Sequence, residues 1–249
     1  MIMRYFIRLA YNGASFHGWQ IQPDDCSVQE TLEQALSMVL RQEIALTGAG
    51  RTDAGVNAAM MVAHFDVDAE ISNPDGLVHS LNGILTKDIA VYSVFMVHDD
   101  AHARFDATSR TYKYFTHSSK SPFLYPLSWH CPPTLDFDLM NQAAARLSDY
   151  VDFTSFSKLH TDVKTNNCRI SEAHWDKVGE QWVFTITADR FLRNMVRAIV
   201  GTLVEVGRHK ISVDEFCNII EKKNRCAAGM SMPGNALFLW NITYPYPIK

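Results

Sequence analysis

The spacing of apolar residues changes along this chain between a period of two and a period of about 3.6. Segments 4–11 and 60–67 alternate apolar and polar side chains, as half-buried strands do. Between them, Ser27 and Glu30 have the spacing of a helix capping box and precede an apolar stripe of helical period. Because strands are mixed with helices in both halves, the pattern predicts an α+β fold with mostly antiparallel sheet.

The same criteria place the remaining elements. Further strands are predicted at 44–47, 89–97, 109–117, 170–178, 182–188 and 236–244. Further helices are predicted after Pro74, at 137–147, at 193–207, and after Ser212, where Glu215 completes a second capping box.

The two halves of the chain differ in charge, although the net charge is only −4. Residues 1–107 carry six Lys/Arg and fourteen Asp/Glu, which is −8, so residues 108–249 carry +4. This asymmetry predicts two domains, 1–107 and 108–249, with a basic face on the second. A scatter of surface charge without functional meaning explains the numbers equally well.

Composition excludes several classes of protein. A chain of 249 residues with 47% hydrophobic residues is typical of a soluble globular protein. No apolar run reaches the roughly 18 residues of a membrane helix, and the N-terminal segment lacks the features of a signal peptide, so a cytoplasmic location is expected. The five cysteines include no CxxC pair, which argues against a disulfide framework and a zinc site.

The most informative motif is "GAGRTDAGV" at 48–56, which the pattern places in a loop between two strands. It is not a phosphate-binding loop, because it lacks Gly-Lys-Ser/Thr and has Asp53 where a dinucleotide fingerprint needs a third glycine. A carboxylate there would also repel phosphate. An ordinary turn, with Gly55 at positive φ, remains a strong alternative. The adjacent Arg51 instead favours an ionised Asp53 that acts as nucleophile or base.

Several blocks in order along the chain resemble the TruA family of tRNA pseudouridine synthases. The loop 48–56 is similar to the family's first signature, and two further segments are similar to the second and third: "ARFDATSRTYKYF" at 103–115 and "RFLRNMVRAIVGTLVEVG" at 190–207. Shorter matches are "YNGASFHGWQ", "SVQETLEQAL", "DFTSF" and "ALFLWNITYP". The resemblance covers essentially the whole chain. It implies the pseudouridine synthase fold: two related subdomains with mixed, mostly antiparallel sheets that flank a central cleft.

The resemblance implies a role for each matched residue. Asp53 corresponds to the aspartate that attacks the target uridine, at ribose C1′ or at uracil C6. Arg51 corresponds to the arginine that takes the place of the flipped base. Tyr112 corresponds to the tyrosine that stacks on the uracil, and Arg197 to the basic partner of the aspartate. Leu239 corresponds to a residue that lines the uracil pocket.

Plainer interpretations accompany these assignments. Tyr112 and Tyr114 share one face of a strand, where packing is the commoner role. Arg197 and Arg193 share a helical face that could simply be solvated, and Leu237 or Leu239 could pack in the core. His17 and His64 show no metal-ligand spacing on a defined element, so no metal site is predicted.

Two departures from the family pattern matter. Asn57 stands where many relatives have histidine, so the resemblance assigns it no role. Segment 121–132 lacks the arginines often found there, which implies weaker RNA contacts in that region or contacts elsewhere. Candidates for phosphate contacts are Lys158, Lys164, Arg169, Arg208 and Lys210.

The sequence therefore predicts a cytoplasmic tRNA pseudouridine synthase that acts on the anticodon stem-loop without metal, redox or nucleotide cofactor. The resemblance implies a homodimer whose interface lies in the second domain. The same domain carries the site residues Tyr112 and Arg197. A catalytically silent RNA-binding or RNA-folding protein of the same fold is the alternative, and a carboxylate-based hydrolase is the third possibility.

Overall fold

A computed structural model describes residues 2–158 and 165–248. By its contacts the chain divides into two compact units, and each is described by itself. Unit 1 runs to Thr108 and includes the residues from Leu239 onward, and unit 2 comprises Ser109–Phe238. The expected domains 1–107 and 108–249 remain a prediction. The contact units differ from them mainly in the described residues from Leu239 onward, which belong to the first unit.

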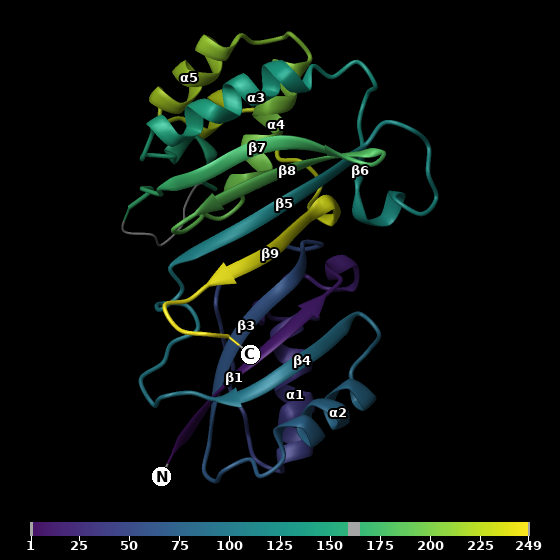
Figure 1. The fold of residues 1–249 in the computed structure, drawn as a ribbon, viewed down its shortest axis with the longest axis vertical. Coiled ribbons are helices and arrows are strands. Elements are labelled where there is room, and N and C mark those ends of the chain that lie inside the picture. Colours follow the sequence, from purple (N-terminus) through teal and green to yellow (C-terminus); the bar gives the residue numbers. More distant parts are fainter. Residues whose placement is uncertain (1, 159–164, 249) are drawn as a thin grey trace. The chain divides into compact units, whose positions relative to one another are not determined.

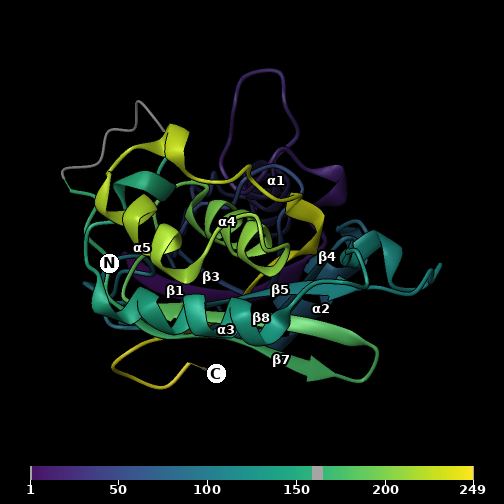
Figure 2. The ribbon, with the colours of Figure 1, turned by 90° about the horizontal axis from the view of Figure 1, so that it is seen from above.

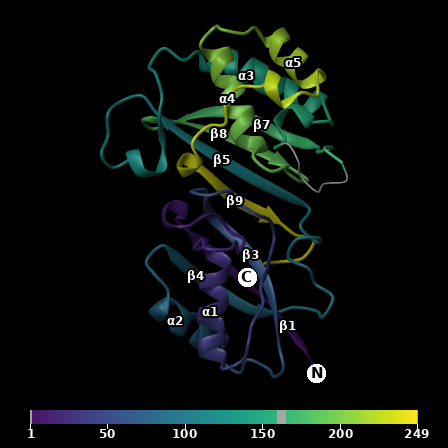
Figure 3. The ribbon, with the colours of Figure 1, turned by 180° about the vertical axis from the view of Figure 1, so that it is seen from behind.

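Unit 1 contains the antiparallel pairs β1–β3, β1–β4 and β2–β3, with two helices on one side of these strands (Figures 1 and 3). Its elements are β1 (Met3–Tyr11), α1 (Val28–Leu40), β2 (Thr47–Gly48), β3 (Asn57–Val67), α2 (Pro74–Ile84), β4 (Ile89–Met96) and most of β9 (Leu237–Thr243). The strand order is β4-β1-β3-β9, and β2 pairs with β3. Tyr5 faces Phe65 across the ladder, and alternate β1 side chains from Tyr5 to Tyr11 are buried, as the period of two predicted.

Unit 2 combines further strands of the sheet with α-helices (Figures 1 and 2). Its strands are β5 (Ser109–His117), β6 (Trp129–His130), β7 (Ile170–Val178) and β8 (Gln181–Ala188), and its helices are α3 (Phe137–Ala145), α4 (Met195–Gly207) and α5 (Val213–Glu221). The order β5-β8-β7 is antiparallel and β6 runs parallel to β5, so the sheet is mixed. The α+β prediction is confirmed.

Aromatic contacts anchor α3 on the sheet of unit 2. The ring of Phe137 stacks on Trp182 at a centroid distance of 4.2 Å and meets Trp175 edge-on at 5.3 Å. Such pairs add to the free energy gained from burial of the rings themselves. The core between α3 and this sheet therefore depends on a few large side chains.

The predicted helix starts are confirmed by their caps. Ser212 Oγ accepts from the Glu215 amide and Glu215 accepts from the Ser212 amide, which completes the capping box of α5. Ser27 Oγ accepts from the Glu30 amide at the start of α1. Helix α4 begins at Met195, two residues later than predicted, because Asn194 has a left-handed backbone at φ 66°.

The predicted strand at 44–47 was wrong except for Thr47, which forms β2 with Gly48. The Ile44 amide donates to Ser37 Oγ at 2.9 Å, and the Leu46 amide donates to Glu33 Oε1 at 2.7 Å. Side chains of α1 thus accept hydrogen bonds from the amides that a β-ladder would use.

Two glycines make a close contact between α4 and the segment that precedes β9. A Cβ atom on Gly201 would overlap the carbonyl oxygen of Met230, and a Cβ on Gly229 would lie 2.9 Å from the Gly201 carbonyl oxygen. The Gly229 amide also donates to Thr202 Oγ1 at 2.9 Å. Backbone therefore packs directly on backbone at this point.

Gly201→Ala should lower the free energy of unfolding by about 2–3 kcal/mol, because the added methyl group has no space and the contact is with backbone. Gly83→Ala is the matched control: Gly83 lies in α2, and a Cβ atom there would have open space around it, so the change should be neutral or raise stability by about 0.5–1 kcal/mol. Urea unfolding followed by tryptophan fluorescence measures both. Equal midpoints for Gly201→Ala and wild type would contradict the prediction.

Candidate active site

The loop 48–56 connects β2 to β3 in unit 1, as the sequence predicted. Its centre is a tight turn in which the Val56 amide donates to the Asp53 carbonyl at 3.1 Å and Gly55 has φ +74°. Positive φ at the third position is the requirement of a type II turn. The expected conformation of Gly55 is confirmed, and the turn places a half-buried Asp53 beside an exposed Arg51.

Hydrogen bonds from segment 11–19 hold this loop in place. The Gly55 amide donates to the Phe16 carbonyl at 3.2 Å, and the Trp19 amide donates to the Thr52 carbonyl at 3.3 Å. The buried Thr52 hydroxyl lies 2.8 Å from the Tyr11 hydroxyl. Residues on both sides of Asp53 are therefore fixed by a second segment of chain.

Asn57 also contributes to this anchoring, and the sequence did not indicate it. Its side chain is 1% exposed, and its Oδ1 accepts from the Gly13 amide at 2.8 Å. A Cβ atom on Gly13 would overlap the Val56 carbonyl oxygen, so only glycine allows this approach. Asn57 therefore binds the segment before Phe16 to the end of the loop.

The predicted residues of unit 2 begin with Tyr112, on β5. Tyr112 is half-buried, and its ring meets Phe191 edge-on at a centroid distance of 5.0 Å. Phe191 belongs to the third signature segment, so the second and third signatures are in contact here. The aromatic ring is held in place by packing rather than left free to rotate.

Tyr114 lies on the same face of β5 but in a different environment. Its side chain is 0% exposed, and among the described residues its hydroxyl makes no hydrogen bond. Burial raises the pKa of this hydroxyl, while the nearby Arg197 guanidinium acts to lower it. The two tyrosines that the sequence could not separate thus differ: Tyr114 is a core residue close to Arg197, and Tyr112 is partly accessible.

Tyr114→Phe should leave the free energy of unfolding unchanged or raise it by up to about 1 kcal/mol, because the change removes a buried, unbonded hydroxyl. Tyr5→Phe is the matched control in unit 1. The buried Tyr5 hydroxyl accepts from the Ile71 amide at 3.0 Å, and its loss should cost about 1 kcal/mol. Chemical denaturation compares the two variants, and a larger loss for Tyr114→Phe than for Tyr5→Phe would refute this assignment.

Arg197 lies in the first turns of α4 and is half-buried. Its Nε donates to the Met232 carbonyl at 2.6 Å, and the Met232 amide donates to the Arg197 carbonyl at 3.1 Å. Ser231 is in turn held by Asn194 Nδ2 at 2.6 Å. The guanidinium is therefore oriented by the segment before β9, whereas Arg193, one turn earlier, is exposed.

The structure brings some of the predicted site residues together. Arg51 and Asp53 share one turn in unit 1, and Leu239 is a buried residue of β9 in the same unit. Tyr112 and Arg197 belong to unit 2. The convergence of Asp53 with Tyr112 and Arg197 remains a prediction.

Other candidate residues have evident structural roles. His64 Nδ1 accepts from the Ala103 amide at 3.1 Å, and burial lowers the pKa of this imidazole to about 4. Arg208 and Lys210 both pair with Glu205, at 3.2 and 3.0 Å. Lys164 lies outside the described residues. Within the described part of the chain, no cluster of three His, Cys, Asp or Glu side chains could hold a metal ion, and no helix is long and apolar enough to cross a membrane.

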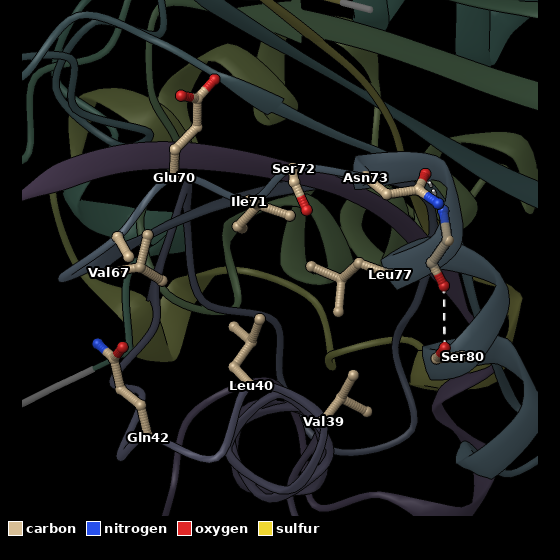
Figure 4. A pocket seen from close by; sticks show the side chains of 12 residues that line it. Val39, Leu40, Gln42, Val67, Glu70, Ile71, Ser72, Asn73, Leu77 and Ser80 are labelled. Atoms are coloured by element: carbon tan, nitrogen blue, oxygen red, sulfur yellow. Dashed lines mark hydrogen bonds between the residues drawn. The ribbon is translucent and has the colours of Figure 1, made fainter.

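A pocket of about 510 Å³ lies elsewhere in unit 1, between the end of α1, the end of β3 and the start of α2 (Figure 4). Its lining includes the apolar side chains of Val39, Leu40 and Leu77. Among its polar side chains, Asn73 Oδ1 accepts from the Gly76 amide and Ser80 Oγ donates to the Gly76 carbonyl. None of the predicted site residues lines it.

Comparison with known proteins covers nearly the whole chain. The sequence model of a family described as tRNA pseudouridine synthase matches residues 9–106 and 143–245. A protein of Parabacteroides distasonis named tRNA pseudouridine synthase A is 59% identical over 249 residues, which are 99% of each chain. Proteins of the same name from Bacteroides fragilis and Bacillus subtilis are 59% and 38% identical, over 99% and 97% of this chain and 98% and 99% of their own.

Proposed function

The chain belongs to the tRNA pseudouridine synthase family, and from that premise we propose that it converts uridine to pseudouridine in the anticodon stem-loop of tRNA. The reaction is an isomerisation: the glycosidic N1–C1′ bond breaks, the uracil turns over, and a C5–C1′ bond forms. The proton displaced from C5 is balanced by the proton that N1 gains. No electron leaves the substrate, so the proposal requires no redox or nucleotide cofactor.

The observation that carries the proposal is the turn that presents Asp53. A carboxylate on a turn fixed from both sides meets the need of a nucleophile that must reach one atom of the substrate. In the proposed reaction Asp53 attacks ribose C1′ or uracil C6. The first forms an ester to the sugar and the second an adduct of the base, and both resolve to the same product.

The neighbouring side chains have the chemistry for the other steps. The exposed Arg51 can enter the stack that the target base leaves, because a guanidinium stacks on bases and also pairs with phosphate. The half-buried Tyr112 ring can stack on the extruded uracil, and Leu239 can cover its apolar edge. Arg197 would pair with the Asp53 carboxylate through a charge-assisted hydrogen bond.

Two further statements belong to this proposal, and one alternative stands against it. The enzyme acts in the cytoplasm, where its tRNA substrate lies. It acts as a homodimer through the second half of the chain. The alternative, a silent RNA-binding protein of the same fold, predicts a chain that binds tRNA without changing it.

The decisive experiment is pseudouridine mapping in unmodified tRNA incubated with the purified protein. The proposed function predicts new pseudouridine confined to the anticodon stem-loop. Tight tRNA binding with no pseudouridine at any position would favour the silent alternative, and pseudouridine only outside the anticodon arm would refute the proposed position.

A further inference from the structure

The loop between β5 and β6 in unit 2 exposes large apolar side chains in a short stretch. Phe123 is 91% exposed and Tyr125 is 71% exposed, and Leu127 beside them is 38% exposed. Single exposed apolar residues are common, but two largely exposed aromatic side chains two residues apart indicate a surface used for binding. We call residues 121–127 the aromatic loop.

The aromatic loop has a defined shape. The Tyr125 amide donates to the Ser121 carbonyl at 3.2 Å, and the Leu127 amide donates to the Leu124 carbonyl at 3.1 Å, within a short 3-10 turn. Asn235 Nδ2 donates to the Pro126 carbonyl at 3.2 Å. The two rings are thus presented on an anchored turn, which limits the entropy lost when they bind a partner.

The base of the loop is held as well. The Cys131 amide donates to the His117 carbonyl at 2.8 Å where β6 pairs with β5. His117 Nδ1 lies 2.9 Å from Ser128 Oγ, and the His117 ring stacks on His130 at 5.2 Å. The exposure of the rings is therefore a property of a structured loop.

The surrounding sequence has the charge expected for an anionic partner. Between Asp106 and Asp136 no acidic residue occurs. Lys120 lies in the loop between β5 and β6, and Arg110 and Lys113 lie on β5 before the loop begins. The chain as a whole has a net charge of −4, so this stretch is unlike the rest. Basic residues with exposed aromatic rings and serine hydroxyls are the groups that bind an RNA strand.

The area of the patch argues against a second protein chain as its main occupant. Two aromatic side chains offer on the order of 400 Å², about half of the 800 Å² per partner that a stable interface needs. Nucleobase stacking needs only one ring face for each base.

We propose that Phe123 and Tyr125 are an RNA-stacking site, on which unpaired nucleobases of the bound tRNA lie. This inference rests on the proposed function and adds contacts distant in sequence from Asp53. It also revises the expectation for segment 121–132: the arginines absent there are replaced by aromatic rings as the source of RNA affinity.

The test uses variants that separate stacking from apolar contact. Phe123→Leu/Tyr125→Leu keeps apolar volume but removes both π faces, and Phe123→Tyr/Tyr125→Phe keeps them. The leucine pair should weaken tRNA binding about tenfold or more, measured by filter binding with the full chain, and the aromatic pair should bind within about twofold of wild type. Met38→Leu, at a 70% exposed site on α1, is the control for an exposed apolar residue elsewhere.

Two further readouts decide between the outcomes. The dependence of affinity on salt should keep its slope in the leucine pair, because no charge is removed, and should become shallower in Lys120→Ala. Light scattering reports the oligomeric state. Unchanged tRNA affinity in the leucine pair overturns the proposal, as does a change in oligomeric state, which would assign the aromatic loop to a protein interface.

These results separate this inference from the proposed function. If wild type forms pseudouridine and the leucine pair binds tRNA normally, only the stacking site fails. If wild type binds tRNA through the aromatic loop but forms no pseudouridine, only the proposed reaction fails.

Discussion

Asp53→Asn should reduce the rate of pseudouridine formation by about 10⁴-fold or more, while tRNA affinity stays within about twofold. The amide has the size of the carboxylate and can make hydrogen bonds, but it has no negative charge with which to attack carbon. The backbone carbonyl of residue 53, which accepts from the Val56 amide at 3.1 Å, is retained, so the turn should persist. Single-turnover kinetics with radiolabelled tRNA measures the rate, and filter binding measures the affinity.

Ala54→Ser is the control within the same turn, because Ala54 is exposed and its side chain is small. This variant should retain activity within a few-fold, and both variants should unfold at the temperature of the wild type within about 2 °C. If Asp53→Asn retained activity near that of wild type, Asp53 would not be the nucleophile.

Arg197→Lys should reduce the rate by about 10²-fold with little change in tRNA affinity. Arginine offers a planar group with several donors, and its Nε is bonded to the Met232 carbonyl at 2.6 Å, which orients the remaining nitrogens. Lysine keeps the charge but has a single flexible ammonium group, so it loses this orientation. The rate under single-turnover conditions and the tRNA dissociation constant should therefore respond differently.

Arg193→Lys is the matched control for Arg197→Lys. Arg193 is exposed one helical turn earlier, and the contact that holds its backbone, the Lys158 amide to the Arg193 carbonyl at 3.1 Å, does not involve the side chain. Its rate should stay within about threefold of wild type. If Arg197→Lys loses affinity rather than rate, Arg197 belongs to the phosphate-binding surface and not to the reaction.

Most secondary structure was predictable because it depends on neighbours in sequence. Ser27 and Ser212 cap α1 and α5 with their own side chains, and the strands β1 and β3 follow the period of two. The strand predicted at 44–47 failed for the opposite reason: Ser37 and Glu33, on the preceding helix, bind its amides. These side chains lie 7 and 13 residues before the amides that they bind, so the local sequence pattern does not reveal the contacts.

The candidate site also has features that depend on neighbouring residues and features that depend on distant ones. The motif around Asp53, the turn at Gly55 and the membership of a family of RNA-modifying enzymes follow from residues next to one another in the chain. The role of Asn57 could not be predicted, because it depends on Gly13, 44 residues earlier.

Turn, cap and periodicity signals act over a few residues, so the sequence predicted most of the helices and strands, and the family resemblance supplied the candidate site residues. The burial and the neighbours of those residues depend on tertiary contacts. The tertiary structure buried Tyr114 near Arg197 and left Tyr112 partly open on the same strand. It also exposed Phe123 and Tyr125 on an anchored loop. The physical reason is that burial and orientation depend on segments brought together by folding, and a linear pattern does not contain those contacts.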